Sequence, residues 1–234
     1  GHALRLCGIL HDIVLARGDR CPSTYAFLPG SDLFTSADSV SDAEVFVALD
    51  APELRRLGDA ERLARAATTL VMLDHHPDAS RQGHIHVFDP DAPAPGTLVF
   101  ELLGHLGVTA DRAIATCLYT ALLTDTGRFS YSNTTVYALR VAASLIEAGA
   151  DPNAVFTAAY EDRSRGAQRL IGLALERITL ANDGRVAYSW IASEDLTSTG
   201  ARPEETENLI DHLRALGGVD VVVLLKAGDD VVRG

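Results

Sequence analysis

The stretch Leu70-Val-Met-Leu-Asp-His-His76 is a short apolar run that ends on one acid and two imidazoles. An apolar run of this length is typical of a buried strand in an α/β sheet. In open α/β sheets, binding residues lie at the carboxyl ends of the strands. The run therefore predicts that Asp74, His75 and His76 stand at the functional edge of such a sheet.

Two further acids follow predicted elements in the same manner. Asp50 comes directly after the apolar run Val45-Phe-Val-Ala-Leu49. Asp125 follows the segment from Asp111 to Thr124, whose apolar residues fall on one face of a helix. Because strand ends meet at one sheet edge, we expect Asp50, His75 and Asp125 to converge.

Imidazole and carboxylate together suit a Mn, Zn or Fe site. The three cysteines, at positions 7, 21 and 117, contain no CxxC pair, so a thiolate zinc site is not indicated. Two structural interpretations stay open for these residues alone. A lone Asp at a strand end is more often a cap or turn residue. Clusters of acids and imidazoles also occur as structural networks.

In this context Asp74-His75-His76 resembles the signature of the DHH phosphoesterases, the superfamily of RecJ-type exonucleases, bacterial nanoRNases and family II pyrophosphatases. Asp50, at the end of Val47-Ala-Leu-Asp50, supports the resemblance. The segment Leu123-Thr-Asp-Thr-Gly-Arg-Phe-Ser-Tyr-Ser-Asn-Thr-Thr135 is similar to the form seen in the nanoRNase branch. Members of that branch act on short oligoribonucleotides, on 3'-phosphoadenosine 5'-phosphate or on cyclic dinucleotide products.

The resemblance implies a role for each of these residues. His75 should bind metal, Asp50 should bridge two metals, and Asp125 should complete the second. His76 should face the substrate phosphate as a catalytic residue, and Asp74 should orient the neighbouring ligands. The implied cofactors are two divalent cations, with Mn favoured over Mg for such ligands. These cations would clamp the phosphoryl group and lower the pKa of a bridging water, which attacks phosphorus in line.

One part of the family pattern is missing from the sequence. Family members begin with a strand ending in His-x-x-x-Asp-x-Asp, which supplies three more ligands, and these 234 residues contain no such pattern. The opening Gly1-His-Ala-Leu-Arg-Leu-Cys-Gly resembles the helix after that motif. We therefore expect a truncated chain: inactive by itself if those ligands are absent from the molecule, and part of a normal enzyme if they are merely omitted.

The order of apolar patterns predicts an α/β fold, because helical segments alternate with strands as in βαβ units. By the resemblance, residues 1–166 form the DHH phosphoesterase domain, a mainly parallel sheet flanked by helices, without its first strand and motif. Residues 167–234 form a linker helix and a partial, α+β DHHA1-like substrate-binding domain. Val219-Asp-Val-Val-Val-Leu-Leu225 is interpreted as a strand of this smaller domain.

Arg128 and Phe129 follow closely after Asp125 and are candidate substrate-binding residues. A guanidinium can pair with a phosphate, and an aromatic ring can stack on a base. The alternative is a turn, because Gly127 and Ser132-Asn133 are turn formers and Arg128 could pair with a neighbouring carboxylate.

The remaining histidines that could be taken for ligands are given a structural interpretation. His2 and His11 read as residues of loops or turns, where histidines are commonly exposed. His84 and His86 would share one face of a strand. We interpret that pair as part of an edge strand rather than as ligands.

Composition limits the partners. A net charge of −12 is unfavourable for gripping long duplexes, because affinity for phosphate backbones comes from Lys and Arg. A short RNA or a nucleotide is the expected substrate, held by cations that supply local positive charge. No window of eighteen apolar residues and no signal peptide is found, so we expect a cytoplasmic protein without membrane attachment. Pairing as a homodimer is an open expectation from the family.

The leading hypothesis is a metal-dependent phosphodiesterase or phosphatase that hydrolyses short oligoribonucleotides (nanoRNA, pApA-type dinucleotides) or 3'-phosphoadenosine 5'-phosphate. Two alternatives stay open. One is a hydrolase like the family II inorganic pyrophosphatases. The other is a non-catalytic nucleotide-binding DHH protein.

Overall fold

The two predicted strands lie side by side in the computed structural model of this chain. β3 (Val45–Leu49) pairs in parallel with β4 (Thr69–Asp74), which pairs in parallel with β5 (Ile85–Phe88). The structure describes residues 13–14, 21–206, 209–227 and 232–233. His2 and His11 lie outside these described residues.

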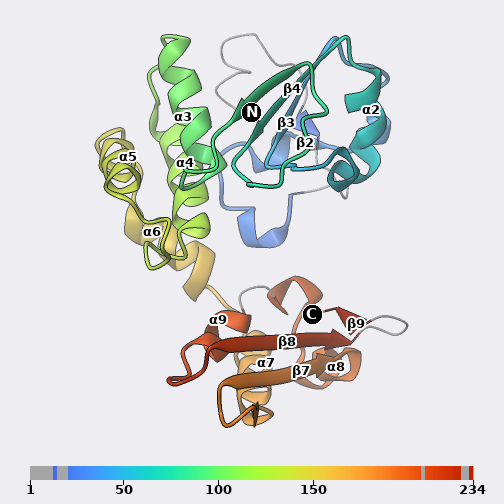
Figure 1. The fold of residues 1–234 in the computed structure, drawn as a ribbon, viewed down its shortest axis with the longest axis vertical. Coiled ribbons are helices and arrows are strands. Elements are labelled where there is room, and N and C mark those ends of the chain that lie inside the picture. Colours follow the sequence, from blue (N-terminus) through green and yellow to red (C-terminus); the bar gives the residue numbers. More distant parts are fainter. Residues whose placement is uncertain (1–12, 15–20, 207–208, 228–231, 234) are drawn as a thin grey trace. The chain divides into compact units, whose positions relative to one another are not determined.

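Helical segments cover both faces of this three-stranded sheet (Figure 1). On one face, Leu70 and Met72 of β4 pack in a cluster with the 3-10 segment Leu54–Ala60 and with α2 (Glu61–Ala66). On the other face, Leu73 packs against α3 (Pro95–His105). β4 is thus buried on both sides, which explains its uninterrupted apolar sequence. A short parallel pair, β1 (Ile13–Val14) and β2 (Phe34–Thr35), precedes the sheet.

Side-chain caps determine where the next helices begin. The Asp111 carboxylate accepts a hydrogen bond from the Ile114 backbone N–H at 2.8 Å and starts α4 (Arg112–Asp125). The Thr135 hydroxyl accepts one from Ala138 and starts α5 (Val136–Glu147), which is followed by α6 (Pro152–Phe156). α4 has 14 residues, and Asp125 is its last residue. No helix in the described part of the chain is long and apolar enough to cross a membrane.

The C-terminal part of the chain forms a separate mixed sheet. β7 (Val186–Ala192) is parallel to β8 (Val221–Ala227), and these central strands are flanked by the antiparallel β6 (Thr179–Ala181) and β9 (Val232–Arg233). Buried side chains from α7 (Arg165–Glu176) and α9 (Leu209–Arg214) pack against Ile191 and Leu224 of the sheet.

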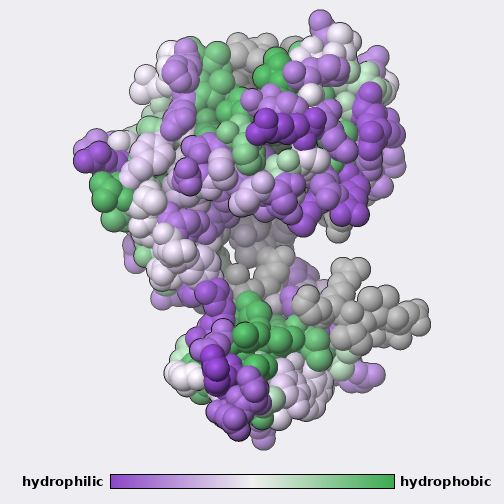
Figure 2. Space-filling view, viewed as in Figure 1, coloured by the Kyte–Doolittle hydropathy of each residue, from purple (hydrophilic) through white to green (hydrophobic). Residues whose placement is uncertain are grey.

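The other face of this mixed sheet is open among the described residues. Trp190 of β7 is 42% exposed and Val221 of β8 is 50% exposed. Figure 2 shows hydrophobic residues over β8 on the visible face. The helices therefore bury only one side of the second sheet, in contrast to the first.

The fold class is α/β, as the alternating pattern predicts: a parallel sheet with helices, and a smaller unit built on a mixed sheet. The chain divides into two compact units, Gly1–Ala158 and Ala159–Gly234. The boundary predicted after residue 166 lies within the first turn of α7. The identity of the two units as DHH and DHHA1-like domains stays a prediction.

A partly buried ion pair connects the end of one helix to another helix in the second unit. Arg177, directly after α7, donates from its two terminal nitrogens to Asp195 of α8 (Ser193–Thr199), at 2.5 and 2.9 Å. Asp195 also accepts a hydrogen bond from the Ala192 backbone N–H. These bonds, those from Arg177 above all, hold the pKa of Asp195 below its ordinary value.

We expect Asp195→Asn to destabilise the second unit by about 2 kcal/mol at pH 7, because it removes the charge that pairs with Arg177. A lowered carboxyl pKa stabilises the fold above the unfolded-state pKa, and this contribution is lost as pH falls through the folded-state pKa. The difference between parent and variant should therefore shrink at pH 3. Urea unfolding followed by Trp190 fluorescence measures it, with the exposed Glu194→Gln as control. Equal stabilities at pH 7 would contradict the prediction.

Candidate metal centre

The parallel pairing of β3 and β4 brings the ends of the two strands together. Leu49 is aligned with Leu73, and the Asp50 backbone N–H donates to the Leu73 carbonyl at 3.0 Å. Asp50 has a positive φ of 56°. Asp tolerates this left-handed conformation better than most residues. The chain therefore turns directly after β3, and the half-exposed Asp50 carboxylate lies beside His75 and His76.

His75 is oriented by a backbone carbonyl. Its Nδ1 lies 2.9 Å from the Ala92 carbonyl oxygen. Because a carbonyl oxygen only accepts, Nδ1 carries the proton of the neutral ring and Nε2 keeps its lone pair. Nε2 lies 4.0 Å from Asp50 Oδ1. A backbone carbonyl that binds the far nitrogen in this way is typical of metal-binding histidines.

His76 is oriented by the acid at the end of β4. Asp74 Oδ1 accepts hydrogen bonds from the His76 backbone N–H at 2.7 Å and from Nδ1 at 2.8 Å. Asp50 Oδ1 lies 3.5 Å from the same Nδ1. Both partners of Nδ1 are carboxylates, so this nitrogen is a donor and Nε2 is the free acceptor.

Asp50, His75 and His76 form a group whose donor atoms all lie within 4.8 Å of one another. One carboxylate and two imidazoles are ligands that suit a divalent transition metal. Asp74 Oδ2 is buried beside this group and has no hydrogen-bond partner among the described residues. An unpaired buried acceptor costs stability unless a cation or donor compensates it. The residues present therefore fit a divalent cation.

Asp125, the third predicted ligand, is not part of this compact group. It lies close enough for the charges of Asp50, His75 and His76 to affect its pKa. It ends α4, and its pKa is raised to about 6. Burial is the main cause, the negative charge of Asp50 adds to it, and His75 and His76 oppose it. Without a nearby cation, the ionised form of this carboxyl is thus less favourable than that of an exposed one. Its role as a ligand stays a prediction.

A left-handed turn follows Asp125. Gly127, Arg128 and Phe129 have φ values of 55°, 62° and 60°. This conformation is strained for Arg and Phe, and Tyr131 packs so closely on Gly127 that a Cβ there would overlap its ring. Arg128 is exposed, whereas Phe129 packs its ring 6.0 Å from that of Tyr119. Substrate binding by either residue stays a prediction.

The sequence interpretation missed Asn133, which it treated as a turn former. The side-chain amide of Asn133 donates to the Pro93 carbonyl at 2.9 Å and to the Asp125 carbonyl at 3.1 Å. An Asn eight residues after a candidate ligand was the only signal, and spacing alone does not reveal such contacts.

His84 and His86 bind backbone groups at the β5 end of the sheet. His84 Nδ1 accepts from the Leu70 backbone N–H, and His86 Nε2 bonds the Gly83 carbonyl. β5 is an edge strand among the described strands. His86 thus lies on the edge strand, as expected, whereas His84 immediately precedes β5 and does not share a strand face with it.

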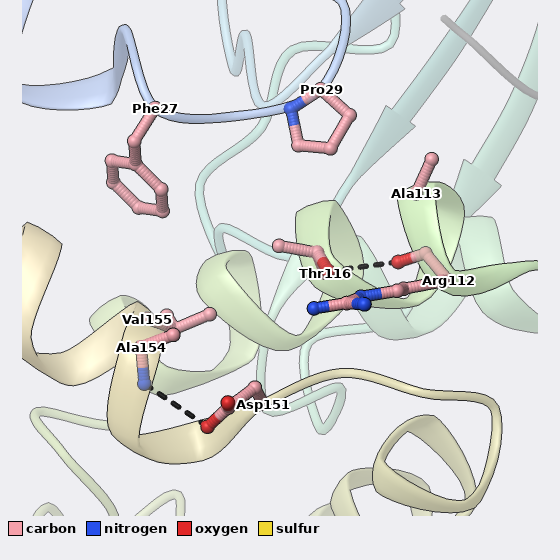
Figure 3. Close-up of a pocket in the computed structure, with 8 residues that line it drawn as sticks. All are labelled: Phe27, Pro29, Arg112, Ala113, Thr116, Asp151, Ala154 and Val155. Carbon is pink, nitrogen blue, oxygen red and sulfur yellow. Dashed lines mark hydrogen bonds between the residues drawn. The ribbon is translucent and has the colours of Figure 1, made fainter.

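A cavity lies elsewhere in the first unit (Figure 3). It has a volume of about 390 Å³, and Phe27, Arg112, Thr116 and Asp151 are among its lining residues. The lining on α4 extends from Arg112 to Thr116, whereas Asp125 ends the helix, so roughly 13 Å of helix separate the cavity from Asp125. We place the chemistry at the sheet edge, because the ligand residues converge there.

Comparison with known proteins finds relatives but no matching family model. The bifunctional oligoribonuclease and PAP phosphatase NrnA of Thermus thermophilus is 30% identical over 213 residues, which cover 91% of this chain and 63% of that protein. NrnA of Bacillus subtilis is 26% identical over 167 residues, or 70% and 53%. The chain thus spans less than two thirds of the length of these relatives.

The fold is shared with a solved structure. An exopolyphosphatase-related protein from Bacteroides fragilis superposes with a TM-score of 0.88 at 20% identity, over 99% of this chain and 71% of that one. At this identity the likeness establishes the fold alone.

We expect Asp125→Asn to stabilise the metal-free protein by about 1–2 kcal/mol at pH 8, because the folded state disfavours the ionised carboxylate. Below pH of about 4 the carboxyl is neutral in both states, so the gain should vanish. In the presence of Mn at pH 8 the parent should be more stable than the variant, since the variant lacks a charged ligand.

Urea midpoints in EDTA and in Mn measure these differences. Asp59→Asn, which changes an exposed acid of the same unit, is the control and should change little in either condition. If Mn raises the urea midpoint of the parent no more than that of Asp125→Asn, Asp125 is not a ligand.

Proposed function

This chain belongs to the DHH family of phosphoesterases and is related to the NrnA proteins, and from that membership we propose that it hydrolyses phosphate esters of short nucleotides. The proposed substrates are short oligoribonucleotides, including pApA-type dinucleotides, or 3'-phosphoadenosine 5'-phosphate. The observation that carries the proposal is the convergence of Asp50, His75 and His76 at the carboxyl ends of parallel strands. Because the chain spans 63% of the Thermus relative, the activity is proposed for the protein as a whole.

Asp50 and His75 are the proposed metal ligands in the compact group, with Asp125 as a further ligand. When bound, two divalent cations, with Mn favoured over Mg, would stabilise charge on the phosphoryl oxygens and lower the pKa of an attacking water. Asp50 is suited to contact more than one cation, because its carboxylate has two oxygens and is half exposed. His75 is suited to one, because Ala92 already binds its Nδ1.

His76 and Asp74 are the proposed catalytic pair. Asp74 holds the proton of His76 on Nδ1, so Nε2 of the neutral ring is free to accept a proton from a water or from a protonated phosphate oxygen. Asp74 is 3% exposed and contacts substrate only through His76. It is therefore a positioning residue, and His76 is the residue that we place against the substrate.

Arg128 and Phe129 are the proposed substrate contacts next to Asp125. Arg128 is exposed and follows the proposed ligand Asp125 closely, and its guanidinium would bind two phosphate oxygens at once. Phe129 would stack its ring on a base. A net charge of −12 supports a short substrate over a long duplex, since few cations can neutralise a long backbone. Pairing of two copies and a cytoplasmic location stay predictions.

We expect the whole protein to release mononucleotide from a diribonucleotide in Mn and to lose this activity in EDTA. His76→Ala should lower kcat by about 100-fold or more while retaining Mn affinity, because its proposed role is toward phosphate and protons. His105→Ala changes an exposed histidine at the end of α3 and is the matched control.

Two results would replace the proposal by a named alternative. Cleavage of pyrophosphate without mononucleotide release would indicate a hydrolase like the family II pyrophosphatases. Nucleotide binding by the whole protein without hydrolysis would indicate a non-catalytic nucleotide-binding protein.

A further inference from the structure

Asn133 connects two segments that are far apart in the sequence. Its amide nitrogen donates one hydrogen bond to the Pro93 carbonyl and a second to the carbonyl of Asp125. Both partners are carbonyl oxygens, which only accept, so the atom that faces them must be the nitrogen. The orientation of the amide is therefore settled by its partners.

Each of the two segments carries a proposed ligand. The carbonyl of Ala92, one residue before Pro93, orients His75 through its Nδ1. The carbonyl of Asp125 belongs to the residue whose side chain is the further proposed ligand. Asn133 thus binds the peptide next to the one that holds His75, and it binds the backbone of Asp125 directly.

Among the short polar side chains, only asparagine offers the donors that this contact needs. The NH2 group offers two donors from one atom, which two separate carbonyls require. An aspartate of the same shape would place an oxygen against both carbonyls and would repel them. The serine or threonine hydroxyl has a single donor and could satisfy only one of the two segments.

The oxygen of the same amide is left without a hydrogen bond, which lowers stability. Asn133 Oδ1 is buried and has no hydrogen-bond partner among the described residues, and the same is true of Thr134 Oγ1. A buried acceptor without a partner costs stability. Local rules of this kind are broken mainly at functional sites, which agrees with a role of this amide in holding the site.

We propose that Asn133 is a positioning residue of the metal centre, fixing the distance between His75 and Asp125 by tying the Ala92–Pro93 segment to the end of α4. The inference rests on the proposed function, because it takes both residues as ligands. Asn133 contacts neither cation nor substrate and acts through the backbone. Its loss leaves every ligand in the chain but lets the two halves of the ligand set move independently.

The test measures Mn affinity and the stability of the metal-free protein as two separate readouts. Electron paramagnetic resonance of free Mn follows binding to the whole protein, and urea unfolding in EDTA follows its stability. Asn133→Ala and Asn133→Asp should each lower Mn affinity by about 10- to 100-fold, the usual loss when the group that orients a ligand is removed. Asn153→Ala, an exposed asparagine on α6, should change neither readout.

A matched core variant separates positioning from a general loss of stability. Leu145→Ala removes a fully buried side chain of α5 and should lower the urea midpoint at least as much as Asn133→Ala does. At a temperature where both proteins are folded, Leu145→Ala should keep its Mn affinity. In an Asp125→Ala background, Asn133→Ala should cost less affinity than in the parent, because one of the two residues it positions is gone.

The outcomes distinguish this inference from the proposed function. If the parent binds Mn and Asn133→Ala binds it equally well, the positioning role is wrong and the proposed function stands. If Leu145→Ala loses as much affinity as Asn133→Ala at equal stability, the effect is general and the positioning role is again wrong. If the parent binds no Mn, both fail. Reduced affinity without phosphoesterase activity would support the positioning role and overturn the proposed function alone.

Discussion

The parallel register of β3 and β4 is the constraint on which the candidate site depends. Because Leu49 is aligned with Leu73, the residues that follow each strand emerge at the same edge of the sheet. A shift of one residue would turn the side chains of β4 to the opposite faces and break the packing of Leu70 and Leu73. The hydrophobic core on both faces of β4 therefore fixes the position of Asp50 relative to His75 and His76.

The parts of the site that follow from strand ends could be predicted from the sequence. A short apolar run with an acid and two imidazoles after it specifies a buried strand, and the parallel pairing then brings Asp50 to His75. The turn after Asp125 could not be predicted in the same way. Arg128 and Phe129 adopt a left-handed conformation that their own preferences oppose, so packing around Gly127 and Tyr131 decides it. The contacts of Asn133 likewise depend on how two distant loops meet.

Unfavourable features are concentrated at this one edge of the sheet. Asp74 Oδ2, Asn133 Oδ1 and Thr134 Oγ1 are the buried side-chain atoms without a partner in the described part of the chain. Of the five non-glycine residues with positive φ in the described ranges, three are in or next to the proposed ligand set, namely Asp50, Arg128 and Phe129. The packed hydrophobic clusters of the first unit offset this loss of stability. Such a distribution is expected where function, rather than stability, selects the residues.

The charge of the site explains why a cation and this arrangement belong together. Asp50 and Asp74 lie within 4 Å of the His76 ring, and burial and the charge of Asp50 raise the pKa of Asp125 to about 6. Three acids near one edge repel one another, and a neutral ligand or a phosphate would leave that repulsion uncompensated. A divalent cation removes it and at the same time offers positive charge to a phosphate in an acidic protein. The acids that make the metal-free site unfavourable are thus the ones that would make it bind a metal and then an anionic substrate.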